Sequence, residues 1–480
     1  MSTAFNKTKI VATIGPATRS KEKILELIHA GVNVFRLNFS HDIHEEHAKV
    51  INWVNEFNSK FGHSIAVLQD LQGPKIRIGD IEGGAVDIKE GEELVITNNP
   101  IVGNAQRVST TYSNIVKDVK AGDNIMIDDG NLQVRVKEVK GNEIVTEVTY
   151  GGKLKSKKGM NLPDTDISES SLTAKDRRDL DFGLEVDVNW VALSFVRTAQ
   201  DIEYVKDLIK ERGSNAKVIA KIERPEAIKN FDAILRAADG IMVARGDLGV
   251  EIKMEDVPMI QKEIIRKCNQ AAKPVIVATQ MMESMIGNPR PTRAEANDVA
   301  NAVLDGADAV MLSAESAAGK FPVETVQAMV KIITAVERST DSIYHRNYEF
   351  NPEHDTYTGN LIVESASDIS EKMHAKAFVG MTDSGFTGFR ISRHRPKANI
   401  YIFSTDQHLA CTLNLAWGVK AFFYQPKEGQ GTMDTFYELA EVLKEKGLLE
   451  KGDVYINIAG APIGRKEKVK TNMMKVSVVR

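Results

Sequence analysis

Eight short runs of apolar residues recur in the first two thirds of the chain, and most end beside polar residues. Continuous apolar runs are typical of parallel strands buried on both faces. Segments with helical spacing lie between most of them, so the pattern predicts an α/β protein with a (β/α)8 TIM barrel. The active site of such a barrel lies at the carboxyl ends of its strands. The runs are Ile10–Ile14, Val32–Phe35, Ile65–Leu68, Trp190–Leu193, Val218–Ala220, Ile241–Ala244, Val275–Ala278 and Ala309–Leu312.

A region of different texture follows the third run. Short strand-like segments alternate with glycine-containing turns, which favours a small all-β structure. We expect a β-barrel lid domain over residues 72–164, inserted between barrel segments 1–71 and 165–340, with Thr173 capping the next helix. The strand-like segments are Ala85–Ile88, Glu93–Thr97, Asn124–Ile127, Leu132–Val139 and Glu143–Val148.

A second α/β pattern begins near residue 340. Five further strand-like runs are separated by helical stretches, which predicts an open α/β domain over residues 341–480. The runs are Ala377–Gly380, Ile400–Phe403, Lys420–Phe423, Val454–Ile458 and Lys475–Val479.

The composition excludes several classes of partner and cofactor. The 480 residues include 62 Lys and Arg against 66 Asp and Glu, which supports neither a nucleic-acid surface nor a membrane-binding patch. Cys268 and Cys411 are the only cysteines, so a disulfide framework or a thiolate metal site is not expected. No leader-like or membrane-length apolar run is present, and we expect a cytoplasmic protein.

The fifth and sixth runs end in charged residues. Lys221 and Glu223 are two positions apart, so they share one face of a strand. Asp247 follows the next strand, and the two carboxylates could hold one Mg²⁺ ion. The alternative is purely structural ion pairing, of Lys221 with Glu223 or of Arg245 with Asp247.

Further polar residues follow the other runs. Arg36, Asn38 and Ser40 are spaced by two and are predicted to share a face, where the guanidinium could bind a phosphate or carboxylate. Thr279 and Ser313 supply hydroxyls after the last two strands, although helix capping is an alternative role. A mouth rich in cations and carboxylates suits phosphoryl transfer or enolate stabilisation.

Seven segments resemble the pyruvate kinase family, and the resemblance runs nearly from end to end. It implies Mg²⁺-dependent transfer of the phosphoryl group of phosphoenolpyruvate to ADP, giving pyruvate and ATP in the last step of glycolysis, by a homotetramer. The segments are Thr8–Ala17, Arg36–His41, Gly73–Arg77, Lys221–Glu223, Val243–Glu251, Ala278–Ser284 and Met311–Glu315.

The resemblance also implies roles for individual residues. The implied Mg²⁺ ligands are Glu223 and Asp247, and the implied catalytic residues are Lys221, Arg36, Thr279 and Ser313. Substrate contacts fall on Arg36, Lys221, Gly246, Asp247 and Thr279, and nucleotide contacts on Arg77, Lys175 and His41.

Many pyruvate kinases need K⁺, bound at positions that match Asn38, Ser40, Asp70 and a threonine at position 71. This chain has Leu71 at that last position. It also has Lys75 where the K⁺-dependent enzymes carry glutamate, so we expect the ammonium to replace K⁺. The alternative is an exposed Lys75 and K⁺ binding through the three remaining ligands.

The family binds phosphorylated effectors in the C-terminal domain. Thr382, Ser384 and Thr387 follow its first strand and open a helix, where hydroxyls and N–H groups can hold a phosphate. With basic residues in the loop Gly460–Lys468, the segment indicates a sugar monophosphate or AMP as effector. An ordinary helix-capping turn is the alternative interpretation.

Two other functions share some of these features. A Mg²⁺-dependent enolate-forming lyase or aldolase would use the two carboxylates and an arginine, but it would not need Arg77, Lys175 or a lid. A metabolite sensor on the same fold would have no need to keep all four of Lys221, Glu223, Asp247 and Thr279.

Overall fold

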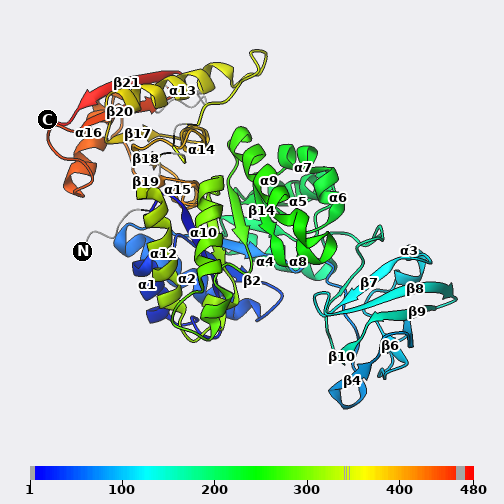
Figure 1. Cartoon of the computed structure of the whole chain (residues 1–480). Helices are drawn as coiled ribbons and strands as arrows, with labels where there is room; N and C mark the ends of the chain where they lie inside the picture. Colours follow the sequence, from blue (N-terminus) through cyan, green and yellow to red (C-terminus); the bar gives the residue numbers. More distant parts are fainter. Residues whose placement is uncertain (1–5, 340, 342, 345, 461–470) are drawn as a thin grey trace.

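The computed structural model describes residues 6–339, 341, 343–344, 346–460 and 471–480. Figure 1 shows the barrel at the centre, the inserted domain at one end of it and the C-terminal domain at the other. No helix in these ranges is long and apolar enough to cross a membrane.

The eight apolar runs form the eight strands of a closed parallel barrel, which confirms the predicted fold class. Every residue of six of these strands is buried, since the core covers one face and the surrounding helices the other. Around the barrel the strands are β1 (Lys9–Ile14), β2 (Val34–Asn38), β3 (Ala66–Asp70), β12 (Trp190–Leu193), β13 (Lys217–Ile222), β14 (Gly240–Ala244), β15 (Val275–Ala278) and β16 (Ala309–Leu312).

Helices surround the barrel, and short ones begin at the carboxyl ends of several strands. Thr173 caps α4 through a reciprocal capping box with Asp176, as the sequence predicts. The helices are α1 (Lys21–Ala30), α2 (His44–Phe61), α4 (Ala174–Glu185), α5 (Ala199–Glu211), α6 (Pro225–Lys229), α7 (Phe231–Ala237), α8 (Arg245–Glu251), α9 (Val257–Ala271), α10 (Arg293–Asp305), α11 (Ala314–Ala317) and α12 (Pro322–Ser339).

The chain between β3 and β12 folds around a hydrophobic core of its own, from Ile76 to Leu162. Its strands form a six-stranded and a two-stranded sheet. Arg77 and Ile78 bridge to Gly159 and Thr110, which adjoin the two edge strands of the larger sheet, and the expected β-barrel stays a prediction. The strands are β4 (Ala85–Ile88), β5 (Glu93–Thr97), β6 (Arg107–Ser109), β7 (Asn124–Ile127), β8 (Leu132–Lys140), β9 (Glu143–Tyr150), β10 (Gly152–Lys155) and β11 (Met160–Asn161), with the short helix α3 (Ile115–Asp118).

The C-terminal domain is the open α/β sheet that the sequence predicts, in the strand order β19-β18-β17-β20-β21. The final strand is antiparallel and lies at one edge. The elements are α13 (Tyr357–Lys372), β17 (Ala377–Met381), α14 (Phe386–Arg393), β18 (Asn399–Ser404), α15 (Gln407–Leu413), β19 (Val419–Phe423), α16 (Thr432–Glu445), β20 (Val454–Ala459) and β21 (Met473–Val478).

A buried ion pair joins the C-terminal domain to the amino ends of the barrel strands. Both terminal nitrogens of Arg395 lie 3.1 Å from the carboxylate of Asp308, which directly precedes β16. The guanidinium also lies over the ring of Trp417. The opposite, carboxyl end of the barrel therefore stays available for the chemistry and for the inserted domain.

Candidate active site at the barrel mouth

Lys221 is the centre of the charged cluster at the barrel mouth. Its ammonium donates to Ser194 Oγ at 2.7 Å and lies 2.9 Å from Glu223 Oε1 and 3.2 Å from Asp70 Oδ1. The predicted sharing of one strand face by Lys221 and Glu223 is therefore confirmed, and the ion pair between them forms.

The pKa values within this cluster depend on one another. Burial alone would lower the pKa of Lys221, but the carboxylates of Asp70 and Glu223 outweigh it and raise that pKa. Burial raises the pKa of Glu223, against the opposing effect of Lys221 and with a further contribution from the charge of Asp247. For Asp70, the cations Lys221 and Arg36 overcome the effect of burial and lower the pKa. Lys221 is thus a stable cation and not a proton acceptor at neutral pH.

Two partners fix the orientation of Arg36. Its Nε lies 2.6 Å from Asp70 Oδ2, and one terminal nitrogen donates to Thr13 Oγ1 at 3.0 Å. Asn38 is the last residue of β2, and its Oδ1 accepts from the backbone N–H of Ser40. Ser40 lies beyond the end of β2, so the expected common face for all three residues stays a prediction.

Gly246 and Thr279 meet at the start of α8. The N–H of Gly246 donates to Thr279 Oγ1 at 2.7 Å, and that hydroxyl donates to its neighbouring carbonyl at 2.5 Å. Thr279 and Gln280 both have positive φ, at 69° and 52°, which is a strained conformation for side chains of this size. The strain turns the chain sharply after β15 and fixes the hydroxyl beside α8.

Asp247 also lies on α8 and lines a cavity between the barrel and the inserted domain. The alternative pairing of Arg245 with Asp247 does not form, because Arg245 binds Asp298 at 2.7 Å. No hydrogen bond or ion pair from the described residues reaches the Asp247 carboxylate.

The carboxylates of Glu223 and Asp247 have the surroundings that a divalent cation needs. Glu223 is buried, and its Oε1 lies 2.9 Å from the Lys221 ammonium. Nearby, the carboxylate of Asp247 has no cationic partner among the described residues, and the two acids together suit a hard cation whose other ligands are substrate oxygens. The described residues contain no group of three or more His, Cys, Asp and Glu side chains able to bind a metal.

The other candidate residues lie at different places around the mouth. Ser313 is at the N-cap position of α11, where its hydroxyl makes no capping hydrogen bond and its N–H donates to Glu315 at 2.7 Å. Lys175 on α4 donates to the carbonyl of Phe39 and is paired with Asp179, whereas His41 is exposed. Arg77 belongs to the inserted domain, where it donates to the carbonyl of Lys157 at 3.1 Å.

The expected K⁺ position is largely occupied by protein contacts. Asp70 directs one oxygen to Arg36 and the other to Lys221, and Leu71 is 1% exposed within the apolar core. Lys75 lines the same cavity as Asp247, and its ammonium makes no ion pair or hydrogen bond with any residue that the structure describes.

Two of the three hydroxyls proposed for an effector lie inside the C-terminal domain. Thr382 Oγ1 accepts from the N–H of Gly385, and Thr387 faces Thr471 at 2.8 Å. Ser384 is exposed. Except for Gly460, the basic loop Gly460–Lys468 lies outside the described residues.

Several contacts of the mouth were not predicted from the sequence, although Ser194 directly follows the fourth apolar run. Ser194 and Phe195 bind Lys221 and Glu223 respectively, and Phe195 does so through its backbone N–H at 2.7 Å. Arg224 and Glu251 lie beside the cavity. The contacts of these four residues depend on which strands are neighbours and on how the inserted domain packs. Glu251 ends the segment Val243–Glu251, and Arg224 directly follows Lys221–Glu223.

A closed barrel with paired cations and carboxylates at its mouth, an inserted β domain beside that mouth and a separate α/β domain defines a phosphotransferase of the TIM-barrel type. The family model for "Pyruvate kinase, barrel domain" matches residues 5–326, and that for "Pyruvate kinase, alpha/beta domain" matches residues 360–477. The chain belongs to the pyruvate kinase family.

Curated relatives agree with this assignment over nearly the whole chain. Pyruvate kinase of Corynebacterium glutamicum is 44% identical over 473 residues, which cover 98% of both chains. Pyruvate kinase of Geobacillus stearothermophilus is 43% identical over 98% of this chain and 80% of its own length. Pyruvate kinase of Staphylococcus aureus is 41% identical over 99% and 81% respectively.

Proposed function

We propose that the barrel mouth transfers the phosphoryl group of phosphoenolpyruvate to ADP, with Mg²⁺ held by Glu223 and Asp247. The observation that carries this proposal is the closeness of two acids at the mouth: the charge of Asp247, which has no cationic partner among the described residues, contributes to the raised pKa of buried Glu223. When bound there, Mg²⁺ would neutralise charge on the oxygens of the transferring group.

The cations of the chain prepare the site for two polyanionic substrates. Arg36 is held in one orientation by Asp70 and Thr13, so its remaining N–H groups can bind phosphoryl oxygens without further ordering. Lys221, whose raised pKa keeps it protonated, stabilises negative charge on the phosphoryl group and on the enolate as it forms.

The later proton transfer to the enolate requires a hydroxyl at the mouth. Thr279 Oγ1 both accepts from Gly246 and donates to a carbonyl, which is the bonding of a relay group. Ser313 is the second candidate. For the nucleotide, we propose Arg77 on the inserted domain, with Lys175 and His41 on the barrel.

Substitution of the two acids tests the metal site. Glu223→Gln and Asp247→Asn should each abolish most of the ATP formation from phosphoenolpyruvate and ADP, and should weaken Mn²⁺ binding to the substrate-free protein. Glu226→Gln is the control, since Glu226 is a neighbouring acid that pairs with Arg224. Normal turnover and Mn²⁺ binding in a folded Glu223→Gln protein would refute the assignment.

We also propose that the enzyme does not need K⁺. Two features support this: both Asp70 oxygens have cationic partners, and Leu71 has no hydroxyl. The ammonium of Lys75, in the cavity beside Asp247, would supply the positive charge that K⁺ brings elsewhere.

For the C-terminal domain, residues 341–480, we propose a regulatory role with a sugar monophosphate or AMP as effector. Ser384 and the backbone N–H groups before α14 would hold the phosphate, while Thr382 and Thr387 shape the turn. We further propose a cytoplasmic homotetramer, whose mass sedimentation equilibrium would test.

A further inference from the structure

Helix α8 presents a second acidic residue beside the proposed metal ligand. Asp247 and Glu251 are four residues apart, so they lie one turn apart on the same face. Both line the cavity between the barrel and the inserted domain. Any contact that fixes Glu251 therefore also fixes the helix that carries Asp247.

Glu251 is held by a residue of the inserted domain. Asn161, in the last strand of that domain, donates from Nδ2 to Glu251 Oε1 at 2.8 Å. Glu251 is 4% exposed, and its other oxygen receives no hydrogen bond from the described residues. A buried acid with an unsatisfied oxygen is costly for stability, so this contact calls for a role other than packing.

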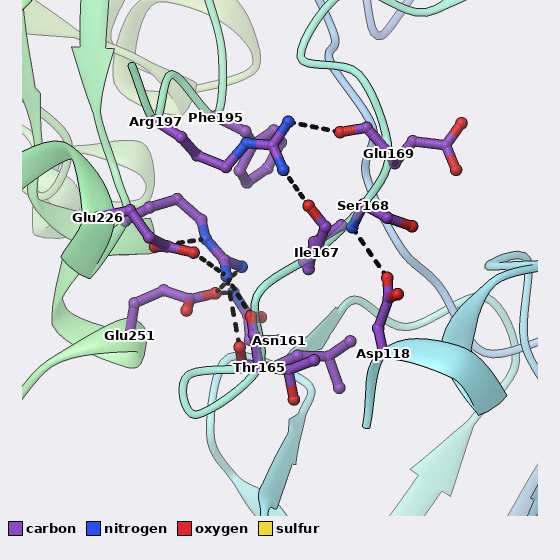
Figure 2. Close-up of polar contacts among 12 residues, drawn as sticks. Asp118, Asn161, Thr165, Ile167, Ser168, Glu169, Phe195, Arg197, Glu226 and Glu251 are labelled. Atoms are coloured by element: carbon purple, nitrogen blue, oxygen red, sulfur yellow. Dashed lines mark hydrogen bonds and ion pairs between the residues drawn. The ribbon is translucent and has the colours of Figure 1, made fainter. Parts of the chain in front are cut away.

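Arg224 connects the same carboxylate to the chain segment that leads back from the inserted domain to the barrel. It directly follows Glu223, lies 3.4 Å from Glu251 Oε1 and donates to the carbonyls of Thr165 and Leu162 at 3.1 and 3.4 Å. Figure 2 shows Asn161, Thr165 and Glu251 converging beside Glu226.

A second arginine holds the rest of this segment. Arg197 donates to the carbonyl of Glu169 at 2.6 Å and to that of Ile167, as Figure 2 shows. On the other side, the N–H of Ser168 donates to Asp118 of the inserted domain at 2.8 Å. The segment is thus bound to both domains, and a rotation of one against the other must act on the contact between Asn161 and Glu251.

We infer that Glu251 is a positioning residue, which links the orientation of the inserted domain to the position of the Asp247 carboxylate through α8. The inference rests on the proposed role of Asp247 as a metal ligand. It implies that the metal site is fully formed only while Asn161 holds Glu251.

Asn161→Ala removes this link and leaves the pair of Arg224 and Glu251 intact. A hydrogen bond to a charged group is worth roughly one to two orders of magnitude in an equilibrium constant, and α8 transmits part of this effect to Asp247. We expect Mn²⁺ affinity of the substrate-free protein and kcat each to fall about five- to tenfold, with KM for phosphoenolpyruvate nearly unchanged. The control is Asn98→Ala, whose amide binds the carbonyl of Ser113 within the inserted domain.

An exchange of the two side chains gives a second, independent measurement. Asn161→Asp alone places two carboxylates together and should weaken Mn²⁺ binding more than Asn161→Ala does. Adding Glu251→Gln restores one carboxylate and one amide in swapped places, so the double variant should recover Mn²⁺ affinity to within about threefold.

Two results would overturn the inference. One is unchanged Mn²⁺ affinity and kcat in folded Asn161→Ala, and the other is a double variant no better than Asn161→Asp alone. Failure of the metal assignment itself is recognised separately, because Asp247→Asn would then leave Mn²⁺ affinity unchanged. A loss of Mn²⁺ affinity in Asp247→Asn together with normal binding in Asn161→Ala would contradict this inference only.

Discussion

Asp70→Asn is the most informative single substitution at the barrel mouth. Asp70 is 1% exposed and lies between two cations, Arg36 at 2.6 Å and Lys221 at 3.2 Å. The amide has the same shape but no charge. The cluster of Arg36, Lys221, Asp70 and Glu223 carries two charges of each sign, so the variant leaves one positive charge uncompensated.

The contacts of Asp70 set the size of the effect. At an effective dielectric constant of about 20, two unit charges 3.2 Å apart attract by about 5 kcal/mol. Removing the carboxylate also removes the cost of burying it, and breaking a buried pair typically costs about 3–5 kcal/mol of stability. Each of the two charge-assisted contacts of Asp70 contributes about 1.5–3 kcal/mol to holding Arg36 or Lys221 in place. Because both contacts are lost, kcat/KM for phosphoenolpyruvate should fall at least about a hundredfold.

The stability loss should depend on pH in a defined direction. The pKa of Asp70 lies below its ordinary value of 3.8, because Lys221 and Arg36 outweigh the effect of burial. Asp70 therefore stabilises the fold above pH 3.8, and that contribution disappears as the pH falls through its folded-state pKa. The difference in melting temperature between the parent protein and Asp70→Asn should be full at pH 7 and shrink below pH 3.8.

Asp308→Asn is a matched control at the other end of the barrel. Asp308 is equally deep, at 4% exposed, and binds Arg395 with both oxygens, but it is far from the proposed chemistry. Both variants should melt earlier in thermal unfolding, whereas steady-state kinetics should show a loss of kcat/KM in Asp70→Asn alone. If Asp70→Asn lost stability as Asp308→Asn does but kept kcat/KM within fivefold, the role of Asp70 would be structural only.

Four further predictions address other sites. Glu223→Gln should lower kcat about a thousandfold with the fold intact, since a metal contact in phosphoryl transfer is worth several kcal/mol; circular dichroism and a coupled assay check this. The parent enzyme should be fully active with tetramethylammonium as the only monovalent cation, and Lys75→Glu should make activity depend on K⁺; strong stimulation of the parent by K⁺ would count against Lys75. Titration calorimetry should detect a sugar monophosphate or AMP whose binding Ser384→Ala weakens severalfold, and an absence of binding outside the barrel would rule the effector out. Burial lowers the pKa of Lys9 from 10.5 to about 7. Between these two pH values the unfolded chain binds a proton that the folded protein does not, so Lys9 makes the melting temperature rise with pH from 7 to 10.5. Melting curves of Lys9→Met should show a flatter rise over this range.

The barrel could be predicted because a strand that is buried on both faces is a continuous run of apolar residues in the sequence. In β12 all four residues, Trp190–Leu193, are buried, so the run is continuously apolar and its ends coincide with the strand. The strands β10 and β11 of the inserted domain contain no continuous apolar run. They are four and two residues long and are defined by pairing with distant segments, β10 with β4 and β11 with β7.

The same distinction applies to the site. The pairing of Lys221 with Glu223 follows from strand periodicity, which the sequence displays directly. The contact from Phe195 to Glu223 does not, because it needs a φ of 54° and the adjacency of β12 and β13. Ser40 lies two residues beyond the end of β2 at Asn38, where strand periodicity is a weaker guide, and its place on that face stays a prediction.

Local charge, rather than the total, explains why the mouth can bind both a cation and polyanions. The chain as a whole has a net charge of −4, which indicates nothing about where cations and carboxylates gather. At the mouth, Asp70 and Glu223 balance Arg36 and Lys221 at contact distance, so the cations stay charged and fixed while buried. Asp247 adds a negative charge that no described residue offsets. With the proposed divalent cation bound at Glu223 and Asp247, the mouth would become net positive, so it would favour the anionic substrates only after the metal has bound.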